Sequence, residues 1–255
     1  MIPVGDFLRR RTTPYVNWTL IAINIAVFVY TLTLDTTGSN TNLPIPISEA
    51  DRFYFDWGAL PACVAETLGV DSGADRDALA FFCPTGERPI VTVFTAMFMH
   101  AGWGHIFGNM LFLWIFGDNV EDRLGHIPYL VFYLVCGVAA MAFQTGFGLD
   151  SLIPTVGASG AIAGVLGAYL VLFPGAIVQV VVFPLFFFPF FLPAVVLIGI
   201  WFVMQLLGGV AELGETGGAG IAWWAHVGGF VAGAILVLIT GARARAGPRL
   251  LDRRT

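Results

Sequence analysis

The chain has 255 residues, of which 57% are hydrophobic and 11% are charged, and its formal net charge is −5. Soluble globular proteins carry about 25% charged residues, so the composition excludes an ordinary soluble enzyme and predicts a protein that crosses the membrane several times. We therefore expect the lipid bilayer, and not nucleic acid, as its partner.

All 12 basic residues are arginine, and most lie near the two ends of the chain. Arginines that flank membrane helices mark the cytoplasmic side. We therefore expect an even number of spans, a basic cytoplasmic tail at 242–255, both termini in the cytoplasm, and a location in the cell or inner membrane. The terminal arginines are Arg9, Arg10, Arg11, Arg243, Arg245, Arg249, Arg253 and Arg254.

The first predicted span covers residues 16–34, directly after the basic N-terminal segment. It is long enough to cross the bilayer and no small-x-small cleavage site follows it, so we interpret it as a retained helix and not a secretory signal. Residues 35–90 form a polar segment in which acidic residues far outnumber arginines, which is typical of an external loop. Cys63 and Cys83 lie here; a disulfide is possible in an exported loop, and free thiols fit the sequence nearly as well.

Residues 91–241 form the core of a predicted single membrane domain. A polar turn with a solvated His126 is expected at 118–126, and the glycine-rich segment 208–220 is expected to be a mobile loop. Prolines interrupt residues 176–209, where the even number of spans favours one helix preceded by irregular or interfacial chain. Together with the first span, an all-α bundle of six transmembrane helices results from the stretches 91–117, 128–147, 157–173, 193–207 and 222–240.

A run of small residues marks the helix predicted at 157–173. Gly160, Gly164 and Gly167 recur at spacings of three and four, which let helix backbones approach closely inside a bilayer. The helix is only about 25 Å long, whereas the hydrocarbon core is about 30 Å thick. Its N-terminus and Ser159 are therefore expected below the membrane surface, where something must bring water to the hydroxyl.

Polar side chains inside spans are costly and usually functional. His105 and Asn109 are four residues apart and share one face of a helix, and His226 lies among small residues that can pack against the Ser159 helix. A serine hydroxyl becomes a good nucleophile when an imidazole takes its proton, and a neutral histidine or asparagine can donate to a developing oxyanion. The set therefore favours hydrolysis by a serine nucleophile without a carboxylate.

The order and spacing of these residues resemble those of the rhomboid intramembrane serine proteases. The resemblance covers about residues 91–241, and its motifs together are highly specific. Two features of many members are missing: an aromatic residue four positions after the serine, where this chain has Ala163, and a Trp-Arg pair in the first external loop. The matching motifs are His100-x4-His105-x3-Asn109, Gly157-Ala-Ser159-Gly160 and Ala225-His226-x-x-Gly229-x-x-x-Gly233.

The resemblance implies an endopeptidase that cleaves other membrane proteins in or near their transmembrane segments, through a Ser–His dyad and without a cofactor or metal. It implies Ser159 as the nucleophile and His226 as the general base. The oxyanion donors would be His105 and Asn109. The residues implied to support the site are His100, Gly157 and Glu121.

Substrate entry is expected beside the fifth span and under the segment 208–220, because closed helices would keep a peptide away from Ser159. Trp201 and Phe202 are the candidate gate residues, since large rings fill such gaps. A smaller residue at either position is expected to ease entry.

Other interpretations stay open on the sequence alone. Packing or interhelical hydrogen bonding explains Asn109 by itself better than catalysis does, and it fits His105 equally well. A metal site is disfavoured because His100 and His105 point about 140° apart around a helix and no His-Glu-x-x-His motif is present. A polytopic transporter would show inverted repeats or acidic residues in its spans, and a catalytically silent rhomboid-like scaffold would lack the serine or the histidine.

Overall fold

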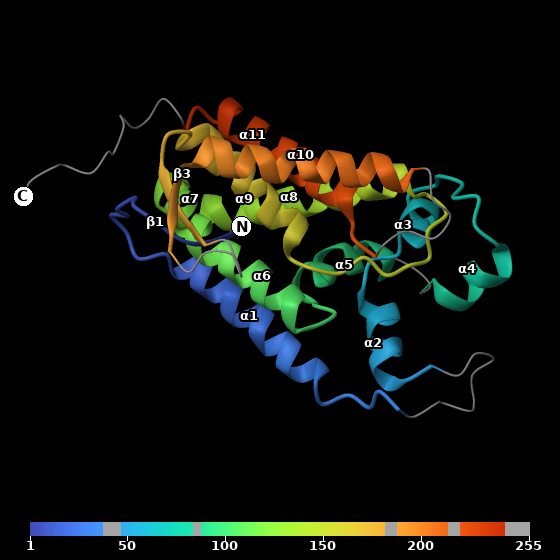
Figure 1. Ribbon diagram of the computed structural model, residues 1–255. Helices are drawn as coiled ribbons and strands as arrows, with labels where there is room; N and C mark the ends of the chain where they lie inside the picture. The colour runs from blue at the N-terminus through green and yellow to red at the C-terminus, as the bar shows by residue number, and fades with distance from the viewer. Residues whose placement is uncertain (38–46, 84–87, 182–187, 214–219, 243–255) are drawn as a thin grey trace, which may run out of the picture.

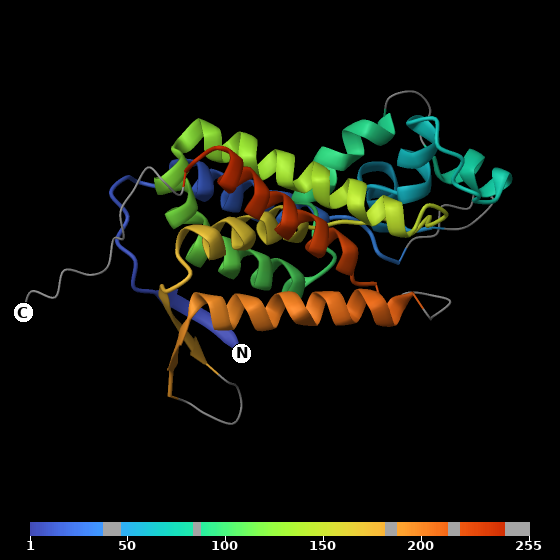
Figure 2. The ribbon, with the colours of Figure 1, turned by 90° about the horizontal axis from the view of Figure 1, so that it is seen from above.

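Helix α9 (Ser159–Leu172) lies at the centre of the bundle and is buried on nearly every side. α8 (His126–Phe147) and α11 (Trp223–Ile239) pack against it, and it lies between other helices in two perpendicular views (Figures 1 and 2). A helix that is apolar all round is expected at such a position. The computed structural model describes residues 1–37, 47–83, 88–181, 188–213 and 220–242.

The glycines of α9 and α11 lie in direct contact, in agreement with the small-residue pattern. A Cβ atom on Gly229 would overlap the carbonyl oxygen of Gly160, and one on Gly233 would overlap that of Gly164. Toward α8, a Cβ atom on Gly160 would lie 2.6 Å from the Cβ atom of Ala140. Glycine therefore permits the helix spacing that brings the start of α9 next to the start of α11.

The second predicted span, 91–117, is not one continuous helix, a break that the sequence did not reveal. Its two halves are bent by 80° relative to each other. The extended backbone of Met99 and Gly102 makes the turn between them. The helical segments are α5 (Arg88–Thr95), a 3₁₀ turn (Ala96–Phe98), α6 (Trp103–Phe112), a π turn (Leu113–Gly117) and α7 (Asp118–Leu124).

The segment 118–126, predicted as a polar turn with a solvated His126, is also mostly helical. Its polar side chains bind other groups instead of water alone. Asp118 pairs with Arg10 of the N-terminal segment at 2.7 Å, and Nδ1 of His126 lies 2.5 Å from Oε1 of Glu121. These contacts stabilise a helix where composition alone predicted a turn.

The number of membrane spans stays a prediction. Among the described residues, α8 and α10 (Ala194–Glu212) are long and apolar enough to cross a membrane, and the bent pair that includes α6 raises the number to three. α1 (Tyr15–Thr31), α9 and α11 are apolar but shorter. The structure thus gives a mostly helical protein with the apolar helices of a membrane protein.

The described part of the predicted external loop 35–90 contains three short helices at one end of the bundle (Figure 1). A disulfide joins Cys63 to Cys83. The sequence had left open whether these two residues are bonded or free thiols. A backbone bridge between Ala59 and Thr155 joins this region to the segment that precedes Ser159. The helices are α2 (Glu49–Trp57), α3 (Pro61–Thr67) and α4 (Arg76–Phe82).

The all-α prediction needs one correction, because a small antiparallel sheet lies at the opposite end of the bundle (Figure 1). The N-terminal strand pairs with a hairpin that lies between α9 and α10, in the order β1-β2-β3. Side chains of 177–181 alternate between more exposed and more buried, the period expected of a strand. The nearly continuous apolar composition concealed this alternation. The strands are β1 (Ile2–Asp6), β2 (Ile177–Val181) and β3 (Phe190–Pro193).

Helix α10 extends beyond the predicted span 193–207 and includes the first part of the predicted mobile loop 208–220. Gly208 lies within the helix and against the first residue of α11, since a Cβ atom there would lie 2.5 Å from the ring of Trp223. The glycines at this point therefore serve helix packing. Residues 214–219 of that loop and 243–255 of the predicted basic tail lie outside the described part of the chain.

Candidate active site

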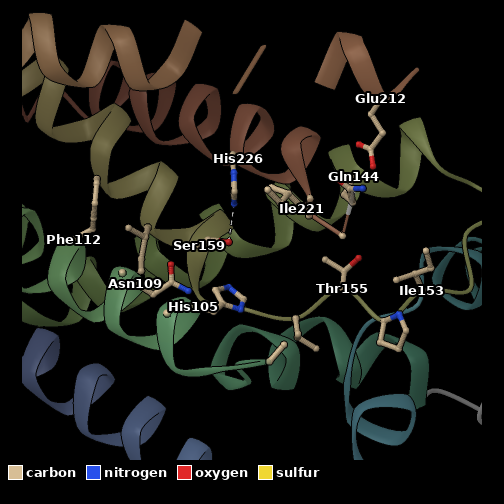
Figure 3. Close-up of a pocket in the computed structure, with 18 of the residues that line it drawn as sticks. His105, Asn109, Phe112, Gln144, Ile153, Thr155, Ser159, Glu212, Ile221 and His226 are labelled. Carbon is tan, nitrogen blue, oxygen red and sulfur yellow. Dashed lines mark hydrogen bonds between the residues drawn. The ribbon is translucent and has the colours of Figure 1, made fainter. Parts of the chain in front are cut away.

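Ser159 and His226 lie side by side, although 67 residues separate them in the sequence. Ser159 is the first residue of α9, and His226 lies in the first turn of α11. Nε2 of His226 is 2.8 Å from Oγ of Ser159 (Figure 3), a normal hydrogen-bond distance. The glycine contacts between α9 and α11 make this approach possible.

Gly157 shapes the chain just before Ser159. Its φ of +128° is a backbone conformation that residues with side chains rarely adopt, and its N–H donates to the carbonyl of Ala96 at 2.8 Å. A Cβ atom at this position would lie 2.7 Å from Nε2 of His105. Glycine is therefore needed both for the backbone conformation and for the histidine beside it.

His105 and Asn109 extend from one face of α6 into the same cavity as Ser159 (Figure 3). Asn109 is buried, and its Nδ2 has no hydrogen-bond partner within the described part of the chain. A buried donor without an acceptor costs free energy. An oxygen atom bound in the cavity would satisfy it.

His100 lies behind His105, in the turn between α5 and α6. Its side chain is fully buried, and its ring packs edge-on against that of His105 with centroids 4.9 Å apart. The hydroxyl of Tyr54 in α2 donates to the His100 carbonyl at 2.9 Å. His100 thus contacts His105 and the external region, and it does not line the cavity.

Ser159 and His226 line a cavity of about 630 Å³. A water molecule takes about 30 Å³ in the liquid, so the cavity has room for many waters or for part of a peptide. The lining residues labelled in Figure 3 are His105, Asn109, Phe112, Gln144, Ile153, Thr155, Ser159, Glu212, Ile221 and His226.

Glu121 lies away from the cavity, near the N-terminus of α1. Its carboxylate is fully buried and accepts hydrogen bonds from the N–H groups of Val16 at 3.1 Å and Asn17 at 2.7 Å. These belong to the first turn of α1, whose N–H groups lack acceptors within the helix. Glu121 therefore caps α1 and supports the fold at a distance from Ser159.

The two candidate gate residues occupy different positions. Trp201 lines the cavity, and its ring centroid lies 6.0 Å from that of His226. Phe202 does not line the cavity and stacks on Phe230 of α11, with centroids 4.2 Å apart. Only Trp201 is therefore in contact with the candidate site, whereas Phe202 holds α10 against α11.

Two glutamines of the site were missed in the sequence. Oε1 of Gln205 in α10 lies 2.8 Å from Nδ1 of His226, and Oε1 of Gln144 in α8 accepts from the N–H of Ala225 at 3.0 Å. A signal was present, because an amide inside an apolar span needs hydrogen-bond partners just as a histidine does.

The Rhomboid domain family matches residues 87–243, which is more than half of the chain. The chain belongs to the rhomboid family. This confirms the resemblance seen in the motifs, and together with the apolar helices it makes the protein an integral membrane protein of that family.

This rhomboid protein spans about half or less of the length of the curated relatives it matches. It is 29% identical over 171 residues to RHOMBOID-like protein 6, mitochondrial, of Arabidopsis thaliana, covering 63% of this chain and 53% of that protein. It is 26% identical over 159 residues to RHOMBOID-like protein 1 of the same plant, covering 62% and 39%. A match of 76 residues at 40% identity links it to Rhomboid protease GluP of Bacillus subtilis, covering 30% of this chain and 14% of that protein.

Proposed function

We propose that this rhomboid protein is an intramembrane serine endopeptidase that cleaves other membrane proteins in or near their transmembrane segments. The observation that carries the proposal is the 2.8 Å contact between Nε2 of His226 and Oγ of Ser159. Asn109 adds a buried amide donor to the same cavity. The B. subtilis relative is named a rhomboid protease, which supports the same activity.

In the first half of the reaction, Oγ of Ser159 attacks the carbonyl carbon of the scissile peptide bond while Nε2 of His226 takes the hydroxyl proton. The carbonyl electron pair moves onto oxygen, and His105, Asn109 and the first N–H groups of α9 donate to this oxyanion. When the C–N bond breaks, His226 gives its proton to the leaving amine. An acyl ester on Ser159 remains.

In the second half, a water molecule from the cavity attacks the ester carbon and gives a proton to Nε2 of His226. The same donors hold the second oxyanion. Collapse of this intermediate breaks the bond to Oγ, and His226 returns the proton to Ser159. One peptide bond and one water are consumed, and one amine and one carboxylic acid are formed.

We also propose six spans in a cell or inner membrane, with both termini in the cytoplasm. α1, α9 and α11 would then be short spans beside α8, α10 and the bent pair. Figure 1 supports the placement of the two ends on one side, because the N-terminal sheet and the C-terminal end of α11 lie at the same end of the bundle, opposite α2–α4.

Substrate would reach Ser159 beside α10. Trp201 lines the cavity from α10, and Phe202 packs α10 against Phe230 of α11. Displacement of these rings would open a lateral path from the lipid to the cavity.

The experiment is cleavage of a transmembrane reporter in proteoliposomes. The wild type should cleave it and Ser159→Ala should not. Ser151→Ala is the matched control, because Ser151 lines the same cavity and should be dispensable. A wild type that binds the reporter without cutting it would favour a catalytically silent scaffold.

A further inference from the structure

Gln205 is buried against His226, in a position that a two-residue Ser–His mechanism does not require. Gln205 belongs to α10, and the residue is only 5% exposed. Burial of an amide costs free energy unless its groups are hydrogen-bonded. Both of its polar atoms have partners, and these partners show what the side chain does.

The hydrogen bond on the nitrogen side fixes which end of the amide faces the histidine. Nε2 of Gln205 donates to the carbonyl oxygen of Trp201, one helical turn earlier, at 3.0 Å. An amide nitrogen donates and an amide oxygen accepts. Oε1 therefore faces Nδ1 of His226 at 2.8 Å, and the ring must present an N–H there.

A proton on Nδ1 leaves the lone pair of the neutral ring on Nε2, which is the atom 2.8 Å from Oγ of Ser159. A general base at Nε2 needs this tautomer. We propose that Gln205 is a positioning residue, which holds His226 in the Nδ1–H tautomer and in the orientation that receives the proton of Ser159. The kinetic consequences of this inference rest on the proposed protease function.

Within the described residues, Ser159 and Gln205 are the hydrogen-bond partners of the His226 ring. Trp201 adds a ring contact with its centroid at 6.0 Å. Ala163, the residue that stands where many rhomboids have an aromatic, is buried in α9 and supplies no ring. The orientation of His226 therefore depends on α10.

The first test is kinetic. Gln205→Met keeps the length of the side chain and removes the acceptor, so kcat for the reporter should fall with KM nearly unchanged. We expect a loss of about 10- to 100-fold, as when metal-bound imidazoles lose their orienting partner. Leu206→Met, at the next and half-buried position of α10, should keep the wild-type kcat.

The second test uses the pH dependence of kcat. Gln205→Glu retains an acceptor oxygen and adds a negative charge beside Nδ1, so it should remain active while the acidic limb of the profile moves up by about 1–3 pH units. His105 on α6 and Glu212 line the same cavity as His226; both are the same in all variants. A limb that keeps its position in Gln205→Glu would contradict the contact between Gln205 and Nδ1 of His226.

The third test does not need activity. ¹⁵N NMR of histidine-labelled protein, with His226→Ala to assign the signal, should show Nδ1 protonated and Nε2 unprotonated in the wild type and a mixture of tautomers in Gln205→Met. If the wild type cleaves the reporter and Gln205→Met has the same kcat, pH profile and NMR pattern, the positioning role is wrong while the protease stands. If the wild type does not cleave, the proposed function fails, and the NMR pattern still decides the role of Gln205.

Discussion

Gly229 of α11 lies against the carbonyl oxygen of Gly160 in α9, so closely that no side chain fits between them. Gly160 directly follows Ser159, and His226 lies three residues before Gly229. The contact that closes the two helices therefore also sets the distance between the hydroxyl and the imidazole. Helix packing and the candidate chemistry depend on the same glycine interface.

Gly229→Ala should reduce stability and reporter cleavage together. The added Cβ atom would overlap the carbonyl oxygen of Gly160, and overpacking of this kind costs about 1–3 kcal/mol. The melting temperature in detergent and the cleavage rate measure the two effects. Gly199→Ala is the control, since a Cβ atom there meets nothing within 4 Å; two variants that behave alike would contradict the packing argument.

The glycine interface was predictable because its signal is local. Small residues at spacings of three and four mark a close helix contact wherever they occur. The break between α5 and α6 was not predictable in the same way, because hydropathy indicates which residues are buried and not where the chain changes direction. Mostly apolar stretches precede and follow the turn at 99–102, so hydropathy alone does not show the 80° bend between the two halves.

The sheet and the role of Gln205 depend on contacts that are distant in sequence. β1 pairs with β2, which follows α9 in the sequence. A short strand shows its period of two only when one face is polar. Gln205 is one amide in an apolar span, and its partner His226 lies 21 residues later. The motifs indicated Ser159 and His226, and an amide in an apolar span needs a partner, but only the three-dimensional structure shows that the partner of Gln205 is Nδ1 of His226.

Thiols placed at the two ends of the bundle should react from opposite sides of the membrane. Leu68 is 65% exposed after α3, and Val4 is 45% exposed in β1. The wild type should be unreactive, because Cys63 and Cys83 form a disulfide and Cys136 is buried.

An impermeant maleimide applied to intact cells should therefore modify Leu68→Cys directly and Val4→Cys only after permeabilisation. Modification of both from one side would rule out the proposed topology. Modification of the wild type would contradict the disulfide.

Asp6 should make the protein less stable as pH rises from about 4 to 6. Burial raises the pKa of this β1 carboxyl, which lies outside the helical spans, from 3.8 to about 6, although Tyr169 donates a hydrogen bond to it at 2.5 Å. The folded carboxyl binds its proton more tightly than the unfolded one, so unfolding releases protons in this window and stability decreases with rising pH.

Asp6→Asn keeps an acceptor for Tyr169 and should remove this part of the pH dependence. The nearby carboxylate of Asp118 also raises the pKa of Asp6, and it is present in both proteins. Melting temperatures from pH 4 to pH 7.5 give the comparison, and parallel curves for the two proteins would show that Asp6 does not titrate there.

Phe202→Ala should raise the rate of cleavage in liposomes and lower the melting temperature. Loss of the stacked pair with Phe230 alone costs about 0.5–1.5 kcal/mol, and α10 can then separate from α11 more easily. Val203→Ala, at an exposed neighbouring position, should change neither quantity. Trp201 is a poorer test because its ring also contacts His226. A folded Phe202→Ala variant that cleaves at or below the wild-type rate would argue against the gate.

Labelling by a serine-directed fluorophosphonate tests the Ser159–His226 pair most directly. The wild type should be labelled at Ser159, Asn109→Ala should be labelled detectably, and His226→Ala weakly or not at all, because without the imidazole nothing takes the hydroxyl proton. Asn109→Ala should lose less than the roughly 10²–10³-fold in rate seen for a lone oxyanion donor, since His105 and backbone N–H groups remain. Strong labelling of a folded His226→Ala variant, or labelling at a serine other than Ser159, would show that the nucleophile or the base has been assigned wrongly.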